Sequence, residues 1–264
     1  MQTNLLQKIS EEYTEGYTQL LEAAYGPSMM SEGGSDFVKD MFEGLDLRGA
    51  SALDIGFGLG GPAQHLAENY GTSVSGVEIC ESMVQRARDR IPAHLKALCH
   101  FQCYEFPDLP YPDATFDVVY SKGVFTHIPE KHEIMRESFR VLKPGGYLVI
   151  KDWLSSGPSW GKRISSLCKM ENLSLFSETV AGYEELFESA GFNLSCSEDW
   201  GTRYEAFNRG IVKDLSGQYG RKLSVRFGKA AIEDSTTGYQ LIADAIRDRE
   251  LKVILFKARK PVSS

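Results

Sequence analysis

The chain of 264 residues is acidic: 29 lysines and arginines stand against 36 aspartates and glutamates, which gives a formal charge of −7. Hydrophobic residues make up 42% and charged residues 25%, the composition of an ordinary globular protein with a core of its own. The acidic balance excludes the broad basic surface that binding to a phosphate backbone requires, so nucleic acid is not an expected partner.

The sequence indicates neither disulfides, nor a metal site, nor a membrane segment. Its five cysteines are an odd number without a C-x-x-C pair, and its histidines lack metal-ligand spacing. The N-terminal stretch MQTNLLQKISEEYTEG has no long apolar run, and no run in the chain approaches the roughly 18 residues of a membrane span. We therefore expect a cytoplasmic protein, monomeric or homodimeric, without a membrane partner.

The first half of the chain predicts alternating helices and strands. Residues 1–45 carry apolar side chains at three- and four-residue steps, which predicts helices interrupted by a loop at 26–35. Further helices are predicted to begin near Pro62, Ser82 and His132, and a turn is predicted at Lys-Pro-Gly-Gly, 143–146. The predicted strands are residues 52–55, 73–79, 99–105, 116–121 and 147–153. Strands that alternate with helices predict a parallel sheet covered on both faces.

The pattern changes after residue 154. A polar, serine-rich stretch leads to a predicted helix at 179–191 and a strand at 192–200, followed by about fifty residues of helical character. The last predicted strand is residues 251–258. We expect one domain over 1–264, with a helical latch at 1–45, a core at 46–154, and a lid with the closing strands at 155–264.

A glycine-rich segment, LDIGFGLGG, follows the first predicted strand. It contains G-x-G-x-x-G as Gly56, Gly58 and Gly61, and Glu78 lies 22 positions after Gly56 at the end of the next strand. Glycines at this place let the backbone approach a ligand, and a carboxylate there can accept both hydroxyls of a ribose. This pattern alone fits NAD and S-adenosylmethionine equally well.

Three further features favour S-adenosylmethionine. Asp54 lies inside the first strand, where a carboxylate suits the ammonium of a methionine tail and would repel a pyrophosphate. Glu105, flanked by Tyr104 and Phe106, ends the third strand, and the Lys-Pro-Gly-Gly segment precedes the fifth. Residues 48–154 therefore resemble a class I S-adenosylmethionine-dependent methyltransferase. That resemblance implies a Rossmann-like α/β fold: a mostly parallel seven-stranded sheet with an antiparallel last strand.

The segments EYTEGYTQLLEAAYGPSMMSEGG (12–34), YSKGVFTHI (120–128) and GYQLIADAIRDRELKVILFKA (238–258) extend the likeness beyond the core. They resemble the phosphoethanolamine (phospho-base) N-methyltransferases, which have an N-terminal helical latch. The resemblance implies a catalytic pair at Tyr13 and His127. With the residues named above and Ser121, the expected cofactor-binding set is Met30, Ser31, Asp54, Gly56, Gly58, Glu78, Ile79, Tyr104, Glu105, Phe106, Ser121 and Lys122.

Such a pair has a clear chemical use. Methyl transfer from a sulfonium is an in-line displacement that needs a neutral nitrogen lone pair at near-attack distance. A histidine, with its ordinary pKa of about 6.5, can take the amine proton at neutral pH. A tyrosine on a closing latch can orient that histidine and exclude water.

The chain departs from this family where the family holds its substrate. The family's Asp, Tyr, Arg and Tyr that hold phosphate and amine fall on Gly123, Trp153, Leu173 and Leu175, and its C-terminal Lys falls near Ile242 or Asp244. Residues 171–180 contain no Arg or Lys, so a phosphate would lack its bidentate clamp. We expect a more apolar pocket for a less charged acceptor, an amine or N-heterocycle.

Several alternatives stay open. Lys162, Arg163 and Lys169 could supply cations, which keeps a phospho-base acceptor possible. The same scaffold could serve an O-methyltransferase of a phenolic or carboxylate metabolite. An NAD-dependent oxidoreductase and a non-catalytic cofactor-binding protein are the remaining readings of the glycine motif.

Overall fold

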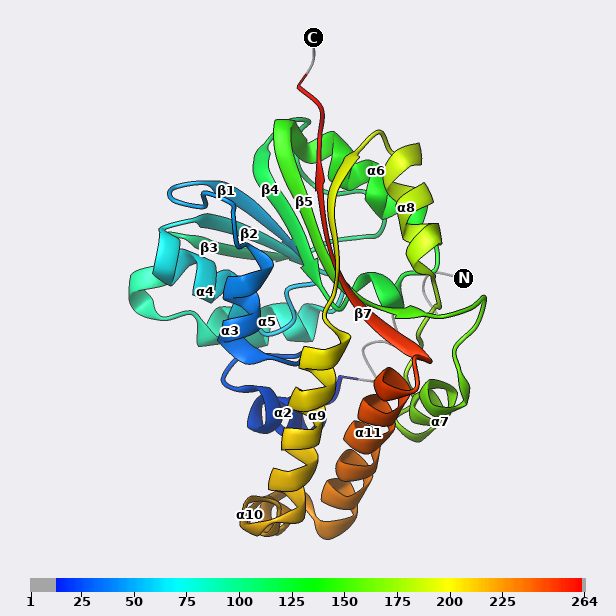
Figure 1. Cartoon of the computed structure of the whole chain (residues 1–264). Helices are drawn as coiled ribbons and strands as arrows, with labels where there is room; N and C mark the ends of the chain where they lie inside the picture. Colours follow the sequence, from blue (N-terminus) through cyan, green and yellow to red (C-terminus); the bar gives the residue numbers. More distant parts are fainter. Residues whose placement is uncertain (1–12, 263–264) are drawn as a thin grey trace.

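A twisted seven-stranded sheet organises the computed structural model, which describes residues 13–262 (Figure 1). The strand order is β3-β2-β1-β4-β5-β7-β6. β7 pairs antiparallel with both of its neighbours, and the other pairs are parallel. This confirms the class I methyltransferase fold. The strands are β1 (Ser51–Ile55), β2 (Ser73–Glu78), β3 (Cys99–Cys103), β4 (Phe116–Lys122), β5 (Leu142–Ser155), β6 (Asn193–Asp199) and β7 (Leu251–Arg259).

The strands form where continuous apolar runs can be buried on both faces. Four of the five residues of β1 and six of the seven of β4 are buried, as the central strands of a covered parallel sheet require. All seven predicted strands are present, but the turn predicted at 143–146 is not. β5 begins at Leu142 and continues through that segment, and Gly145, with φ +83°, absorbs the change of direction beside the irregular register between Phe116 and Val118.

Helices cover both faces of the sheet. α3 (Gly34–Met41), α4 (Gly61–Tyr70) and α5 (Glu81–Arg90) contribute to the apolar cluster on one face, and α6 (Lys131–Val141) and α8 (Val180–Ser189) to that on the other. Two short 3-10 turns, η1 (Ala93–Leu95) and η2 (Phe125–His127), complete this core. Because the connections cross over the faces, the carboxyl ends of β1, β2 and β4 meet at one edge, where ligands bind in such folds.

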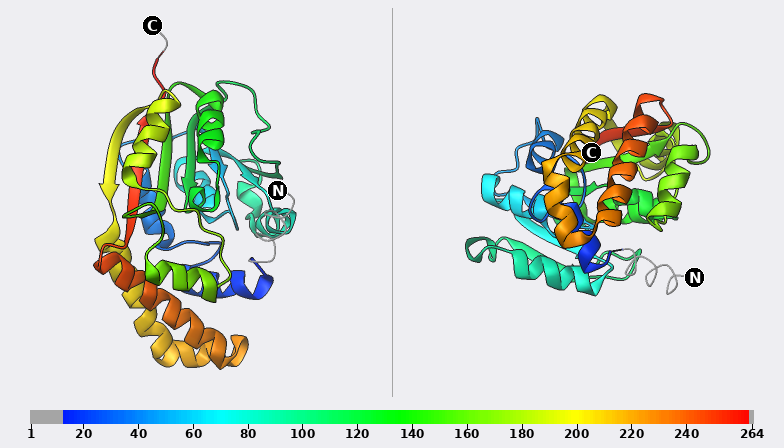
Figure 2. Two further views of the ribbon diagram at one scale, coloured as in Figure 1. Left: turned by 90° about the vertical axis from the view of Figure 1, so that its right-hand side faces the viewer. Right: turned by 90° about the horizontal axis from the view of Figure 1, so that it is seen from below.

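A helical cap stands at this edge of the sheet (Figures 1 and 2). The latch was predicted over residues 1–45, of which 1–12 lie outside the described residues. Its described helices are α2 (Glu15–Tyr25), which belongs to the cap, and α3, which packs on the core through Val38 and Met41. From here on, the latch means α2 and the residues just before it. The Thr14 side chain accepts a hydrogen bond from Tyr17 N and so fixes the start of α2. The predicted helical stretch before the last strand is α9 (Gly201–Ser216), α10 (Gln218–Phe227) and α11 (Lys229–Arg247). α7 (Lys162–Met170) was not predicted, because its serines obscure the apolar positions Ile164 and Leu167 that it buries.

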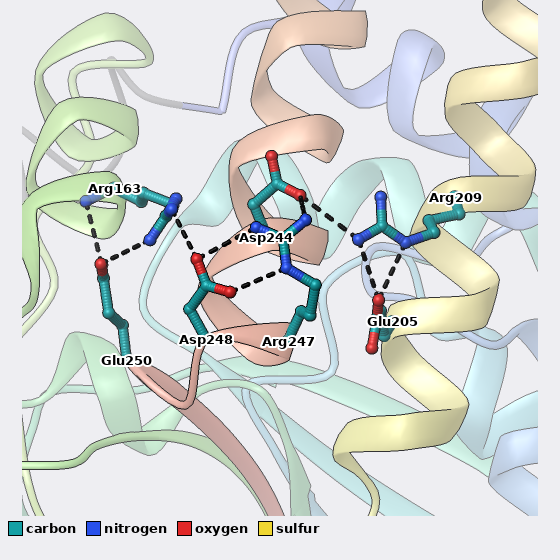
Figure 3. Close-up of polar contacts among 7 residues, drawn as sticks. All are labelled: Arg163, Glu205, Arg209, Asp244, Arg247, Asp248 and Glu250. Atoms are coloured by element: carbon teal, nitrogen blue, oxygen red, sulfur yellow. Dashed lines mark hydrogen bonds and ion pairs between the residues drawn. The ribbon is translucent and has the colours of Figure 1, made fainter.

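A chain of ion pairs links α7, α9, α11 and the turn before β7 (Figure 3). Arg163 pairs with Asp248 and Glu250, Arg247 with Asp244 and Asp248, and Arg209 with Asp244 and Glu205. These side chains are partly exposed, so each pair contributes only a fraction of about 1 kcal/mol, weakened by salt. These ion pairs connect the cap helices α7, α9 and α11 to one another. In the described part of the chain, no helix is long and apolar enough to cross a membrane.

Candidate functional site

A cavity of about 460 Å³ opens at the carboxyl ends of β1, β2 and β4. It lies where the fold places ligands, between the core strands and the latch. Ten of the twelve residues predicted to bind the cofactor line it: Met30, Ser31, Gly56, Gly58, Glu78, Ile79, Tyr104, Glu105, Phe106 and Lys122. Sequence reasoning missed a further part of the wall, formed by Cys80, Met83, Val124 and residues 128–130, because these apolar and loop positions carry no distinctive motif.

The glycines of the turn after β1 are required because neighbouring side chains lie close to their backbone. Gly56 has φ +72°, and a Cβ there would lie 2.5 Å from Val124 Cγ1. Gly58 has φ +56°, and its Cβ would lie 2.9 Å from Met30 Cγ. Both positions disfavour any other residue because the backbone conformation and the space exclude a side chain. The turn therefore presents bare backbone to the cavity.

Glu78 is held in one orientation at the end of β2. Its carboxylate accepts hydrogen bonds from Ile79 N at 2.9 Å, Cys80 N at 3.3 Å and Gly58 N at 3.3 Å. Burial raises the pKa of Glu78, and these backbone N–H groups oppose that rise. The result is a fixed carboxylate on the cavity wall, one that can accept from a pair of vicinal hydroxyls.

Two of the predicted cofactor-binding residues do not line the cavity. Ser121 is fully buried, and its hydroxyl donates to Ile55 O at 3.1 Å. Asp54 is 2% exposed and lies below the glycine turn, where its Oδ2 has no hydrogen-bond partner. Burial raises the pKa of Asp54 to about 7; the charge of Glu78 adds to the rise, and Tyr120 and Lys122 oppose it. The side chains of both residues point into a packed face of the sheet and not into the cavity, which the motif alone does not reveal.

The loop after α2 is anchored to the end of β4 by Lys122. The Lys122 Nζ donates to Ser31 Oγ at 2.6 Å, to Glu32 O at 2.8 Å and to Ser31 O at 3.1 Å. Burial, followed by the nearby Lys151 charge, lowers the pKa of Lys122 well below its usual value. This lysine thus uses its donors to position the loop that carries Met30 and Ser31.

Tyr13 and His127 meet, although 114 positions separate them in the sequence. The Tyr13 hydroxyl lies 3.3 Å from His127 Nε2 in a hydrogen bond. His127 belongs to η2, directly after β4, and Tyr13 precedes α2. Burial lowers the pKa of His127 to about 4, with the charge of Lys131 adding to the effect and the Ser174 backbone opposing it. The imidazole is therefore neutral at physiological pH and can accept a proton.

A second, smaller cavity of about 100 Å³ adjoins the first and shares Tyr13, Met30, Ser31, Gly123 and His127 with it. All four residues predicted for the substrate pocket line it: Gly123, Trp153, Leu173 and Leu175. Ile242, one of the two positions considered for the family's C-terminal lysine, lines it too, whereas Asp244 belongs to the ion-pair chain. The pair Tyr13–His127 thus lies at the junction of the two cavities.

The second cavity is more polar than the sequence suggested. Glu32, Lys151 and Glu171 line it together with four tyrosines, Tyr13, Tyr17, Tyr25 and Tyr239. The cations considered from the sequence lie elsewhere, since Lys162 and Lys169 are exposed and Arg163 is engaged by Asp248 and Glu250. Nothing in the local sequence distinguishes Lys151 from a lysine on a solvated strand. Among the described residues, no cluster of three or more potential ligands could hold a metal ion.

Comparisons with known proteins identify a known domain in this part of the chain. Residues 53–150 match the family model described as a methyltransferase domain, and this segment contains the glycine turn, Glu78 and His127. The match assigns residues 53–150 to a methyltransferase domain, and the sheet has the strand order of the class I methyltransferases. They favour this class over the NAD-dependent oxidoreductases that the glycine motif alone allowed.

The similar proteins include several phosphoethanolamine N-methyltransferases. The chain is 32% identical to phosphoethanolamine N-methyltransferase 1 of Zea mays over 74% of its own length and 38% of the relative. It is 28% identical to phosphoethanolamine N-methyltransferase 1 of Arabidopsis thaliana over 96% of its own length and 54% of the relative. The chain therefore spans about half, or less, of the length of these relatives.

A solved structure shares the fold over nearly the whole chain. It is phosphoethanolamine N-methyltransferase 2 of Haemonchus contortus in complex with phosphomonomethylethanolamine and S-adenosylhomocysteine. The TM-score is 0.88 at 21% sequence identity, and the alignment covers 97% of this chain and 60% of that one. At this identity the likeness establishes the architecture, including the latch and the helical cap, and leaves the chemistry to the site.

Proposed function

We propose that the protein transfers a methyl group from S-adenosylmethionine to the nitrogen of a small acceptor held in the second cavity. The observation that carries this proposal is the contact between Tyr13 and His127 at the junction of the two cavities. A proton acceptor at that junction is where a nitrogen would receive the methyl group and lose its proton.

The first cavity suits the cofactor in size and in the placement of its polar groups. The fixed Glu78 carboxylate is suited to the ribose hydroxyls, and Ile79, Tyr104 and Phe106 offer apolar surface for the adenine, with Glu105 beside them. The bare glycine turn leaves room for the methionine portion, and the buried Asp54 carboxylate beneath it favours positive charge above. When bound, S-adenosylmethionine supplies an electrophilic methyl group on a sulfonium.

The chain's own residues supply orientation and proton removal. The acceptor nitrogen reacts through its free lone pair, so that an N–C bond forms as the S–C bond breaks and the nitrogen becomes positively charged. Its proton then passes to the Tyr13 hydroxyl while the hydroxyl proton moves to His127 Nε2. The imidazole is unprotonated before this step because burial lowers the pKa of His127 to about 4; the same burial makes it a weak base, which accepts the proton only late in the reaction. The latch excludes water from the junction.

Nitrogen is favoured over oxygen as the methyl acceptor. Ionising a phenol demands a strong base or a nearby cation, whereas a free amine needs only a late proton acceptor, which a weakly basic imidazole can be. The relatives named phosphoethanolamine N-methyltransferases support the same choice. They also make a phospho-base the second candidate acceptor. Glu32 and Glu171 in the second cavity weigh against a doubly charged phosphate.

Two measurements test the proposal. Calorimetry with S-adenosylhomocysteine and, separately, with NAD reports which nucleoside binds; binding of NAD alone would overturn it. Transfer of labelled methyl groups to a panel of amines, phenols and phosphoethanolamine then reports the acceptor atom. Label on nitrogen is expected, and label found only on oxygen would contradict the N-methyltransferase assignment. Cytoplasmic location, a single domain over 1–264, and a monomeric or homodimeric state remain predictions.

A further inference from the structure

Lys151 is an unusual feature of the second cavity. It lies in the middle of β5, is fully buried, and its Nζ has no hydrogen-bond partner. The face of the Tyr204 ring lies 4.8 Å from Nζ, measured to its centroid, and the carboxylates of Glu32 and Asp152 are near enough to interact with its charge. A buried ammonium without a hydrogen-bonded partner costs several kcal/mol, so its place on a ligand cavity calls for a ligand that completes it.

Neighbouring residues show that this arrangement is specific to Lys151. Asp152 points to the opposite face of the sheet, where Tyr183 donates a hydrogen bond to it at 2.7 Å. Lys122 stands directly beside Lys151 in the register of β4 and β5, yet its Nζ donates to three oxygens of the loop at 31–32. Of these two adjacent buried lysines, one is structural and the other presents its ammonium to the cavity.

Glu32 presents the opposite charge to the same space. It is 3% exposed, lines the second cavity, and its Oε1 has no hydrogen-bond partner. No hydrogen bond joins it to Lys151, so each buried group leaves at least one atom unsatisfied. An anion-binding group and a cation-binding group therefore share one small cavity: their charges attract each other, but no hydrogen bond or ion pair joins the two described side chains.

Gly123 places no side chain between the ammonium and the first cavity. A Cβ at this position would lie 3.5 Å from Lys151 Nζ and 3.7 Å from Ser31 Cβ, and Gly123 lines both cavities. A ligand group of a few atoms could therefore contact Lys151 close to the junction where Tyr13 and His127 meet. The cavity, at about 100 Å³, accommodates only a small molecule or one end of a larger one.

We propose that the methyl acceptor is a small amino carboxylate, whose carboxylate binds Lys151 and whose amine N–H groups face Glu32. The inference rests on the proposed function and narrows its substrate class. A singly charged carboxylate fits one ammonium in a cavity that also holds two glutamates, Glu32 and Glu171, whereas a phosphate dianion would face that negative charge with a single cation. The carboxylate of the acceptor thus supplies a partner for Lys151 Nζ, and its amine supplies one for Glu32 Oε1.

Matched ligand pairs isolate the carboxylate. Binding to the full chain saturated with S-adenosylhomocysteine is measured by calorimetry for glycine, sarcosine, β-alanine and 4-aminobenzoate. Each is compared with the amine that lacks the carboxylate: methylamine, dimethylamine, ethylamine and aniline. Phosphoethanolamine is the phosphate-bearing comparison. At least one amino carboxylate is expected to bind about 10- to 100-fold more tightly than its partner amine, the value of one charge-assisted contact.

Two variants then assign the contacts. Lys151→Met is expected to remove the advantage of the carboxylate while leaving the partner amine unchanged. Glu32→Gln is expected to weaken both members of a pair. Lys169→Met, an exposed lysine on α7, is the matched control and should change neither. An unchanged affinity for S-adenosylhomocysteine shows that a variant is folded. If Lys151→Met does not meet this criterion, Lys151→Gln replaces it in the comparison.

The possible failures are distinguishable. Equal binding of every pair, an equal loss for both members in Lys151→Met, or preferential Lys151-dependent binding of phosphoethanolamine would overturn the amino-carboxylate inference. The proposed methyltransferase function would survive any of these if methyl groups still reach an amine. Absence of binding to S-adenosylhomocysteine would instead overturn the proposed function itself.

Discussion

At the scale of single residues, the candidate site contains buried ionisable groups whose burial does not stabilise the fold. Asp54 is the clearest case, because burial raises its pKa from 3.8 to about 7. Between these two values the folded protein holds a proton that the unfolded chain has lost, so stability falls as the pH rises through this window. The carboxylate is then available above pH 7 to attract a cationic ligand.

We expect Asp54→Asn to remove this dependence. The gain in the free energy of unfolding relative to the wild type should be larger at pH 8 than at pH 5, by about 2 to 3 kcal/mol at roughly 1.4 kcal/mol per pH unit. Urea unfolding at the two pH values measures the difference. Asp214→Asn, at an exposed position on α9, is the control. An Asp54→Asn effect equal at both pH values would mean that Asp54 ionises normally.

Tyr13 and His127 are expected to act as one unit. If the proton passes through the tyrosine hydroxyl to the imidazole, removing either group breaks the same path. Tyr13→Phe and His127→Ala should each lower kcat by about 100-fold or more, and the double variant should be no slower than the slower single variant. Multiplicative losses in the double variant would show two independent roles.

At the scale of elements, the latch is fastened at several points. Tyr17 OH donates to Glu171 Oε2 at 2.8 Å, Glu22 pairs with Arg90 of α5 at 3.0 Å, and Tyr219 of α10 donates to Ala23 O at 2.8 Å. The first contact lines the second cavity, whereas the Tyr219 contact is on the exposed side. The hydrogen bond from Tyr17 to Glu171 is therefore the latch contact expected to affect binding of the acceptor.

Tyr17→Phe should raise the KM of the acceptor by roughly 10-fold, because it leaves the partly buried Glu171 carboxylate without its donor and loosens the latch over the cavity. Tyr219→Phe also removes a hydroxyl bound to α2, but away from the cavity, so its KM should stay near the wild-type value. Steady-state kinetics on both variants makes the comparison. Equal effects would mean that the latch acts only through its overall stability.

The sequence predicted elements well wherever burial is continuous. The segments of β1 and β4 were predicted as strands from their continuous apolar residues, which the structure buries on both faces of the sheet. α7 was missed because its buried residues Ile164 and Leu167 are spaced among serines, and only the cap tells them apart from a loop. The length of β5 was underestimated because Pro144 and the two following glycines indicate a turn locally, whereas pairing with β4 and β7 extends the strand.

The candidate site was predictable to a different degree. Motif residues such as Gly58 and Glu78 were found because their backbone and charge requirements are local. Lys151 and Glu32 were not, since only the assembled sheet and loop bring their side chains to one cavity. Asp54 and Ser121 were placed on the cavity by the same motifs, but their strands turn them beneath it.

At the scale of the whole molecule, the first cavity lies between the core and the segment around Tyr13, Met30 and Ser31, and the second lies between β5 and the cap helices α7 and α11. Ligand binding should therefore stabilise the fold. S-adenosylhomocysteine at 100 times its dissociation constant should raise the free energy of unfolding by about 2.7 kcal/mol. NAD at the same concentration should leave it unchanged. Thermal unfolding with each compound measures this. A stabilisation by NAD of equal size would contradict the assignment of the first cavity.

The central claim is methyl transfer at the junction that Tyr13 and His127 form. Single-turnover transfer of a labelled methyl group from S-adenosylmethionine, in wild type and His127→Ala, tests it most directly. We predict label on the acceptor nitrogen in the wild type and a rate at least about 100-fold lower in the variant, with unchanged affinity for S-adenosylhomocysteine. Equal rates in the two proteins, or a wild type that binds S-adenosylhomocysteine but methylates no acceptor in the panel, would contradict the account.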